Sequence, residues 1–176
     1  MNEICMRTME IYREITDEEL VNRHADMVYK ICISHLISID ASAVDDAFQN
    51  TFLKYVKYSP KFKDFNSEKA WFIRCAINEC INIYRERKRH SYIPLSKIEN
   101  NLTYNIVSES DSDLLSKLWA LPNKYKDVMH LYYIEEQSAN EIAKTLKISV
   151  PSVCQRLKRG REKLRIQITN SEGRII

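Results

Sequence analysis

The sequence predicts an all-α protein of two small helical domains joined by a flexible linker, with a helix-turn-helix in the C-terminal domain. The chain of 176 residues contains only 2 glycines and 4 prolines, too few for the many tight turns of a β-rich fold. Apolar residues recur at steps of three and four before residue 90 and after residue 113, which is the period of an amphipathic helix. The segment between, 91–113, is rich in Ser and Asn and has no sustained period, as expected of a linker.

Three helices are expected in the N-terminal domain. The first opens with Thr16 and Glu19 in capping-box spacing, and its apolar face carries Leu20, His24, Met27, Val28 and Ile31. The second begins after Asp40 and ends at Pro60, with an inward face of Val44, Ala47, Phe48, Thr51, Phe52, Tyr55 and Val56. The third begins at the candidate N-cap Ser67 and runs to residue 89, with an inward face of Ala70, Ile73, Ile77, Cys80, Ile81 and Tyr84.

The C-terminal domain is expected to end in two helices with well-marked starts. Before them, helical periodicity resumes at Leu114, Leu118 and Leu121 and continues after Pro122 with Val128, Leu131 and Tyr132. Ser138 and Glu141 form a second capping box at the start of a helix of barely two turns, with an apolar side of Ile142, Ala143 and Leu146. After a turn at 147–149, Ser149 caps the last helix and Pro151 lies in its first turn. The apolar face of that helix carries Val150, Val153, Leu157, Gly160 and Leu164.

Charge is distributed in two matching halves, although the net charge is only +3. Residues 1–52 contain 4 basic and 10 acidic side chains, whereas residues 53–90 contain 10 and 4. Residues 91–136 contain 4 and 7, and residues 137–176 contain 9 and 3. Two modules, each with a basic face for an anionic partner, account for this alternation. We therefore assign one domain to residues 1–90, the linker to 91–112 and the second domain to 113–176.

Composition and motifs exclude several classes of protein. The 5 cysteines form no CxxC pair and are odd in number, which favours reduced thiols in a cytosolic protein. No signal peptide and no bilayer-spanning apolar run is visible. HExxH, P-loop, GxSxG and dinucleotide motifs are absent, and the 4 histidines form no metal cluster with the cysteines. We expect a cytoplasmic protein with no membrane insertion, cofactor, metal or catalytic activity of its own. His24 lies on an apolar helical face and is expected to be a core or boundary histidine.

The short helix, three-residue turn and longer basic helix at the C-terminus follow the plan of a DNA-binding helix-turn-helix, whose second helix enters the major groove. Its polar and cationic side chains fall mainly on the surface left by the apolar face: Gln155, Arg156, Lys158, Arg159 and Arg161. A basic helix that only faces solvent is the alternative. The capped short helix, the turn length and Ala143 at the helix–helix contact favour DNA binding.

The segment "LPNKYKDVMHLYYIEEQSANEIAKTLKISVPSVCQRLKRGREKLR" resembles the promoter-reading domain of bacterial sigma factors of the extracytoplasmic-function (ECF) type. The resemblance rests on Leu121–Pro122, "EIAKTL", "ISVPSV" and "RLKRGREKLR". It implies recognition of the minus-thirty-five element, for which the candidates are Ser149, Ser152, Cys154, Gln155, Arg156, Lys158, Arg159 and Arg161. Gln155, Lys158 and Arg159 are placed to read bases, whereas Arg156, Arg161 and Lys163 suit phosphates.

One position of this segment departs from the family pattern. The family often has Gly in the turn between the two helices, where this chain has Lys147. Because Gly suits a positive φ there, Lys147 either costs some stability or adopts another turn geometry. Other transcription regulators share the short helix-turn-helix pattern, so the N-terminal domain has to distinguish between them.

The segment "DDAFQNTFLKYVK" resembles the polymerase-binding helix of the same family, with matching residues at Asp46, Gln49, Thr51, Phe52 and Leu53. The resemblance implies docking on the clamp helices of the β′ subunit of core RNA polymerase, with the β subunit as a further partner. Lys54 also points outward, and the candidate polymerase contacts on this outward face are Asp45, Asp46, Gln49, Asn50 and Leu53. A solvated helix face is the alternative, but Leu53 beside acids and amides fits a partner surface better.

The segment "KAWFIRCAINECINIYRERKR" resembles the promoter-melting and minus-ten-reading helix, through Trp71, Ala76, Asn78, Asn82 and Arg85, with Asn82 in place of the usual Asp. A stripe of aromatic, amide and cationic side chains suits phosphates and unpaired bases, although a core position is the alternative for Trp71. The preceding loop matches the place where the family holds a flipped-out promoter base. The candidate minus-ten residues are Lys63, Asp64, Phe65, Asn66, Trp71, Arg74, Asn78, Asn82 and Arg85.

The two resemblances occur in the family's order and together imply a sigma factor. Its partners would be core RNA polymerase, promoter DNA and, as in many members, an anti-sigma factor. A polymerase-independent helix-turn-helix regulator is the alternative, and it would need a dimerisation surface that no heptad helix or third domain supplies. A sigma-like protein that only sequesters partners is a third interpretation.

Overall fold

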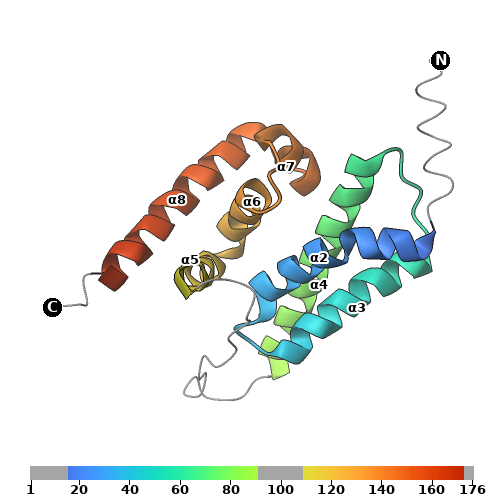
Figure 1. Ribbon diagram of the computed structural model, residues 1–176, viewed down its shortest axis with the longest axis horizontal. Helices are drawn as coiled ribbons and strands as arrows, with labels where there is room; N and C mark the ends of the chain where they lie inside the picture. The colour runs from blue at the N-terminus through green and yellow to red at the C-terminus, as the bar shows by residue number, and fades with distance from the viewer. Residues whose placement is uncertain (1–15, 91–108, 173–176) are drawn as a thin grey trace. The chain divides into compact units, whose positions relative to one another are not determined.

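The computed structural model describes residues 16–90 and 109–172, and these residues form seven α-helices and no strand (Figure 1). The all-α prediction is therefore confirmed. The chain divides into two compact units, Met1–Pro94 and Leu95–Ile176. Whether residues 91–108 form the predicted linker stays a prediction, because these residues lie outside the described ones. None of the helices in the described ranges is long and apolar enough to cross a membrane.

The described residues of the N-terminal unit form three helices that pack on one another in all three pairs: α2 (Asp17–Leu36), α3 (Ala41–Tyr58) and α4 (Phe65–His90) (Figure 1). The capping box of Thr16 and Glu19 is present as predicted. Asp40 caps α3, and its Oδ1 accepts a hydrogen bond from the Ser42 N–H at 3.0 Å. The helix ends before Pro60, where Ser59 takes a left-handed conformation with φ 38°.

The predicted core of this unit is right for α2 and partly wrong for α3 and α4. Every predicted inward residue of α2 is buried. Val56 and Tyr84, however, are 63% and 45% exposed. The inward face of α4 is rotated relative to the prediction, because Phe72 points into the core. Its ring centroid lies 4.6 Å from that of His24 and 5.4 Å from that of Phe52. The inward residues of α4 that the sequence interpretation missed are Phe72, Ala76 and Ile83.

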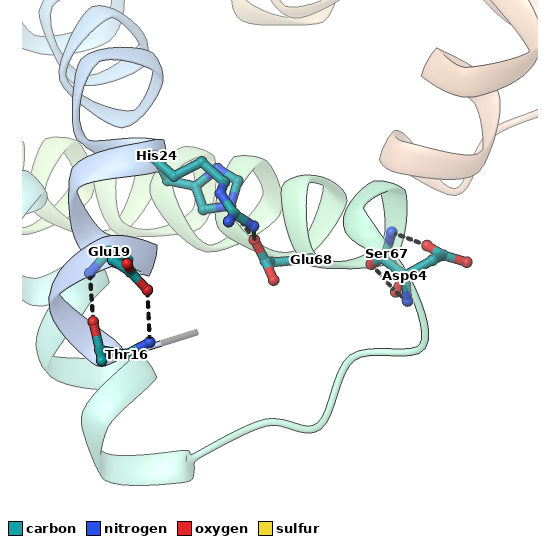
Figure 2. Close-up of polar contacts among 7 residues, drawn as sticks. Thr16, Glu19, His24, Asp64, Ser67 and Glu68 are labelled. Carbon is teal, nitrogen blue, oxygen red and sulfur yellow. Dashed lines mark hydrogen bonds and ion pairs between the residues drawn. The ribbon is translucent and has the colours of Figure 1, made fainter. Parts of the chain in front are cut away.

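The helix α4 begins at Phe65, three residues earlier than the predicted start at Glu68, and Ser67 is not its N-cap. Asp64 precedes the helix, and its Oδ1 accepts from the Ser67 N–H at 2.7 Å. In return, the Ser67 Oγ accepts from the Asp64 N–H at 3.2 Å. This reciprocal pair satisfies two N–H groups that would otherwise lack partners at the start of the helix, as Figure 2 shows.

A buried polar pair joins α2 to the first turns of α4 (Figure 2). Glu68 is only 1% exposed and His24 only 2%, so the expectation that His24 is a core or boundary histidine is confirmed. The His24 Nε2–H donates to the Glu68 Oε1 at 2.6 Å. The Arg23 guanidinium also reaches this oxygen, at 3.3 Å from Nη1. The buried carboxylate of Glu68 thus has both a neutral donor and a cation beside it, as burial of a charge requires.

The C-terminal unit contains α5 (Glu109–Trp119), α6 (Asn123–Tyr133), α7 (Ala139–Leu146) and α8 (Val150–Glu172), and the first three all contact α8. The start of α5 at Glu109 falls inside the predicted linker. Leu114 is 46% exposed and Tyr132 is 39% exposed, unlike the apolar residues predicted with them. The core of the unit contains Leu118, Leu121, Val128, Leu131, Ile142, Val153 and Leu157.

Burial lowers the pKa of the His24 imidazole below its usual value of 6.5, and this effect outweighs the Glu68 carboxylate, which favours the proton. Arg23 already balances the charge of Glu68, so a proton on His24 would add an uncompensated positive charge to a site that excludes water.

We predict that the N-terminal unit loses stability as the pH falls below about 6.5. The unfolded chain protonates His24 there, whereas the folded chain does so only at lower pH, so stability is full above that value and declines toward the folded-state pKa. Urea unfolding between about pH 5 and 8, followed by Trp71 fluorescence in a Trp119→Phe background, measures this. A His24→Gln variant should give a flatter profile. Identical profiles for both proteins would contradict the prediction.

Candidate nucleic-acid interface

The helix α8 begins where the sequence predicts, and its start is well capped. The Ser149 Oγ accepts from the Ser152 N–H at 3.3 Å, and the two hydroxyl oxygens lie 2.8 Å apart. Pro151 lies in the first turn of the helix, where its missing N–H leaves no partner unsatisfied. Of the candidate DNA residues at this end, Ser149 and Cys154 are exposed and Ser152 is half-buried.

The candidate base-reading residues of α8 point away from the core. Val153, Leu157 and Gly160 are buried against the rest of the unit. At 3.6 residues per turn, Gln155, Lys158 and Arg159 fall on the opposite side of the helix, and all three are exposed. The cations assigned to phosphates fall on the two flanks of this side: Arg156 and Lys163 on one, Arg161 on the other. Lys163 and Arg161 are exposed and Arg156 is half-buried.

Gly160 lets α8 pack closely against α6. A Cβ at this position would lie 2.9 Å from the Met129 Cγ and 3.1 Å from its Sδ. Since real Cβ atoms essentially never come that close, a larger residue would require the Met129 side chain or the helices to shift. The glycine therefore permits the close packing of the basic helix on α6 that the structure shows.

Two tyrosines of α6 orient cations of α8, which the sequence interpretation did not anticipate. The Arg161 Nη1–H donates to the Tyr133 Oη at 3.4 Å. The phenol of Tyr125 interacts with the side chains of Lys124 and Arg159. These contacts join α6 to α8 through side chains 28 or more residues apart, so helical periodicity gave no signal of them. They restrict the conformations of two long side chains that would otherwise lose entropy on binding a ligand.

The turn between α7 and α8 adopts the left-handed geometry. Lys147 has φ 54° and ψ 46°, and its N–H donates to the Ala143 carbonyl. The Ile148 N–H donates to the same oxygen at 3.0 Å. Of the two outcomes expected at Lys147, the structure shows the first, a positive φ at a residue with a Cβ. The capping box of Ser138 and Glu141 at the other end of α7 is confirmed.

The candidate minus-ten stripe lies on the side of α4 that faces away from the core. Asn78, Asn82 and Arg85 are exposed, and Arg74 is half-buried. Trp71 is also half-buried. Its ring centroid lies 5.0 Å from that of Phe72, 6.0 Å from that of Phe62 and 6.4 Å from that of Tyr55. The core and surface interpretations of Trp71 therefore both hold in part: one portion of the indole is packed and the rest is open to solvent.

Of the four candidate loop residues, only Lys63 and Asp64 precede α4, whereas Phe65 and Asn66 are its first two residues, and the four differ in how they are held. Lys63, Asp64, Phe65 and Asn66 are all exposed. Asp64 caps α4, as described above. Phe65 is 42% exposed and stacks on His24, with ring centroids 5.9 Å apart and an angle of 19° between the planes. The Arg23 guanidinium lies 5.8 Å from the centre of the same ring. Two of the four residues thus fix the loop, while Lys63 and Asn66 present their side chains to solvent.

The candidate polymerase face lies on α3. Asp45, Asp46 and Gln49 are exposed, Leu53 is 63% exposed, and Asn50 is half-buried. Val56, which the sequence interpretation assigned to the core, continues the same stripe three residues beyond Leu53 and is also 63% exposed. Lys54 does not belong to this face, because its ammonium pairs with Glu79 of α4.

Asp46 forms an ion pair within the unit. Its Oδ2 lies 3.2 Å from the Nη2 of Arg87, near the end of α4. The same guanidinium pairs with Asp40 and donates to the Ser42 Oγ at 3.0 Å. The acidic end of the α3 face is therefore tied to the last turns of α4. Within the described residues, no three His, Cys, Asp or Glu side chains are placed to hold a metal ion.

Both units match models of known domain families. Residues 20–90 match the Sigma-70 region 2 model, and residues 118–165 match the Sigma-70, region 4 model. The two matches together include the whole of α3, α4, α6 and α7, and much of α8.

Several known proteins are similar to most of the chain. It is 30% identical over 138 residues to the RNA polymerase sigma factor SigZ of Bacillus subtilis (strain 168), covering 77% of this chain and 78% of SigZ. It is 28% identical over 165 residues to the ECF RNA polymerase sigma factor SigW of the same organism, covering 85% and 87%. The structure of the sigma factor RpoE in complex with the anti-sigma factor NepR from Bartonella quintana is similar in fold, with a TM-score of 0.68 at 18% identity over 86% and 96% of the two chains.

We predict that Lys147→Gly stabilises the C-terminal unit by about 0.5–1 kcal/mol. The left-handed conformation costs a residue with a Cβ about 1–2 kcal/mol, and the extra freedom of Gly in the unfolded chain cancels part of the gain. Lys144→Gly, at an exposed position inside α7, should instead destabilise by up to about 1 kcal/mol. Urea unfolding followed by Trp119 fluorescence in a Trp71→Phe background measures both. Equal effects of the two substitutions would contradict the prediction.

Proposed function

The chain belongs to the sigma-70 family of RNA polymerase sigma factors, as a member of the ECF type, and we propose a division of its work among three helices. A sigma factor binds core RNA polymerase and directs initiation to specific promoters without being a catalyst. In our proposal α3 docks on the polymerase, α4 with its preceding loop binds the minus-ten element, and α8 reads the minus-thirty-five element. The single observation that carries this assignment is the exposure of a distinct chemical face on each helix.

The face of α8 has the chemistry of a major-groove reader. Gln155, Lys158 and Arg159 offer amide and cationic donors on the side opposite the core, and such donors pair with the acceptor edges of guanine and adenine. Arg156, Arg161 and Lys163 flank that side and suit the phosphates on either wall of the groove. The hydrogen bond of Arg161 with Tyr133 supports a contact of Arg161 with a DNA phosphate, because a cation held at the side of the helix faces a wall of the groove.

The face of α3 suits a protein partner. Leu53 and Val56 expose most of their side chains to water, next to the acidic and amide side chains of Asp46 and Gln49. Apolar residues surrounded by polar ones are typical of the centre and rim of an interface. An occupant with apolar side chains and basic groups, such as the clamp helices of the β′ subunit, would bury the two aliphatic side chains and pair with the carboxylates.

The face of α4 suits unpaired promoter DNA. Asn78, Asn82 and Arg85 can donate to phosphates and base edges. The partly packed indole of Trp71 is fixed by three neighbouring rings, so it can stack on a base with little loss of side-chain entropy. We further propose a cytoplasmic protein with no catalytic activity of its own, and an anti-sigma partner of the kind named for RpoE.

The run-off assay that tests this function uses purified core polymerase, the full chain and fragmented DNA of the source organism. We predict discrete new RNA starts that share upstream sequence. Leu53→Asp should lower the affinity for core polymerase by about tenfold or more, because the charge would be buried in the interface, and should remove the starts at limiting protein. Ile166→Asp, at another exposed aliphatic residue, is the matched control. No starts, together with a footprint of the chain alone on duplex DNA, would instead favour the polymerase-independent regulator.

Two arginines of α8 should differ in the effect of their removal. Arg159→Ala should cost about 1–3 kcal/mol at one base position of the minus-thirty-five element and relax the preference there. Arg161→Ala should weaken binding to all sequences alike and reduce the salt dependence by about one phosphate contact. Holoenzyme binding to a panel of single-base promoter variants at several salt concentrations measures both. An unchanged promoter ranking with Arg159→Ala would remove that residue from base reading.

A further inference from the structure

The α4 helix contains two buried carboxylates, and each pairs with a side chain of another helix. Glu79 is 6% exposed and pairs with Lys54, which links α4 to α3 in the middle of both helices. Glu68 is more deeply buried, at 1% exposed, and lies near the start of α4, directly after the candidate base-holding loop. None of the three faces described above uses it.

Burial makes Glu68 an expensive way to join two helices. Its carboxylate has lost its water, and a buried ion pair is often no more stabilising than apolar side chains of similar volume. Phe72, one turn further along α4, packs on His24 with ring centroids 4.6 Å apart, so a hydrophobic residue could fill this position. What a buried, fully bonded charge supplies instead is one defined geometry, because any displacement leaves a charge unpaired.

That geometry extends from Glu68 to the loop through a closed set of contacts. The Glu68 Oε1 is bonded to His24 at 2.6 Å and to Arg23 at 3.3 Å. His24 and Arg23 in turn hold the ring of Phe65. Its centroid lies 5.9 Å from the centroid of the His24 ring and 5.8 Å from the Arg23 Cζ. Phe65 is therefore held by the same two side chains that hold Glu68.

Residues held by side-chain contacts lie next to residues whose side chains are exposed. Asp64 and Ser67 bond to each other across the start of α4, and Phe65 is held by the cluster. Asn66 lies between these anchored residues and Lys63 directly precedes them, and both are exposed. The backbone that carries the two open polar side chains is therefore anchored on both sides of Asn66.

We propose that Glu68, held by His24 and Arg23, is a positioning residue that fixes residues 63–66 for recognition of an unpaired base of the minus-ten element. This inference rests on the proposed function of α4. Glu68 acts through the backbone of the loop and through Phe65, without touching DNA. The selectivity of the loop for one base then depends on a carboxylate that is inaccessible to the DNA.

The test compares the two buried carboxylates of one helix. Glu68→Met removes the polar contacts of Glu68 with His24 and Arg23 and keeps a side chain of similar length. Glu79→Met likewise removes the pair with Lys54, eleven residues away and about 16 Å along the helix. Glu68→Gln keeps an acceptor for His24 and serves as the conservative rescue. Arg23→Met, at a position whose side chain is 34% exposed, disturbs the cluster with less risk to folding. Run-off transcription with reconstituted holoenzyme uses a promoter set with each base in turn at every minus-ten position.

For Glu68→Met we expect the ratio of transcription from the best and worst base at one minus-ten position to fall about tenfold, since misplacing a positioned group by about 1 Å costs up to about 100-fold. Glu68→Gln should recover most of the ratio. The preference at the minus-thirty-five element should stay unchanged, and Glu79→Met should alter the minus-ten ratio less than twofold at a similar loss of thermal stability. If Glu68→Met does not fold, Arg23→Met should still lower the ratio about threefold.

Two results would overturn the inference. One is an unchanged minus-ten ratio in both Glu68→Met and Arg23→Met holoenzymes. The other is an equal loss in Glu68→Met and Glu79→Met, which would reduce Glu68 to a stability role. In both cases the wild-type chain still directs specific starts, so the proposed function stands. A wild-type chain that directs no starts would remove the proposed function itself, and the inference with it.

Discussion

The burial of one carboxylate constrains the N-terminal unit more than any other interaction. Glu68 is almost fully removed from water and carries a charge that has to be matched inside the fold. Its partners, His24 and Arg23, come from α2, so α2 and α4 can only pack in the register that brings them together. Phe72 then stacks on His24 and contacts Phe52 of α3. The rotation of α4 about its own axis follows from this register, and so does the direction in which the candidate minus-ten stripe faces.

The constraint in the C-terminal unit is steric. The missing side chain of Gly160 allows α8 to approach Met129 and Tyr125 of α6, and the left-handed Lys147 sets the angle at which the chain leaves α7. Matching charges therefore fix the candidate DNA face of the N-terminal unit, and close packing fixes that of the C-terminal unit. The former responds to pH through His24, whereas close packing of apolar groups does not.

Local features of both units could be predicted from the sequence, and long-range ones could not. Both capping boxes join residues three apart, so spacing alone identifies them. The pairs of His24 with Glu68 and Arg87 with Asp46 join residues 44 and 41 positions apart, and no periodicity connects them. The prediction that Val56 is buried was wrong for a related reason. An apolar residue in step with a buried face stays exposed when the neighbouring helices do not cover it, and helix length and crossing geometry are not properties of one segment.

Two of the three candidate faces belong to one rigid core, and this relation determines what polymerase docking can do. The stripe of Leu53 and Val56 on α3 and the stripe of Asn78 and Arg85 on α4 are joined by the pairs Lys54–Glu79 and Arg87–Asp46. A partner that fixes α3 therefore also fixes the outward direction of α4, without any change in the conformation of either helix. The face of α8 lies in the other unit, so docking at α3 cannot orient it through these contacts. Positioning of the candidate minus-ten face of α4 is thus a consequence of packing within one unit, whereas positioning of α8 relative to that unit requires contacts beyond it.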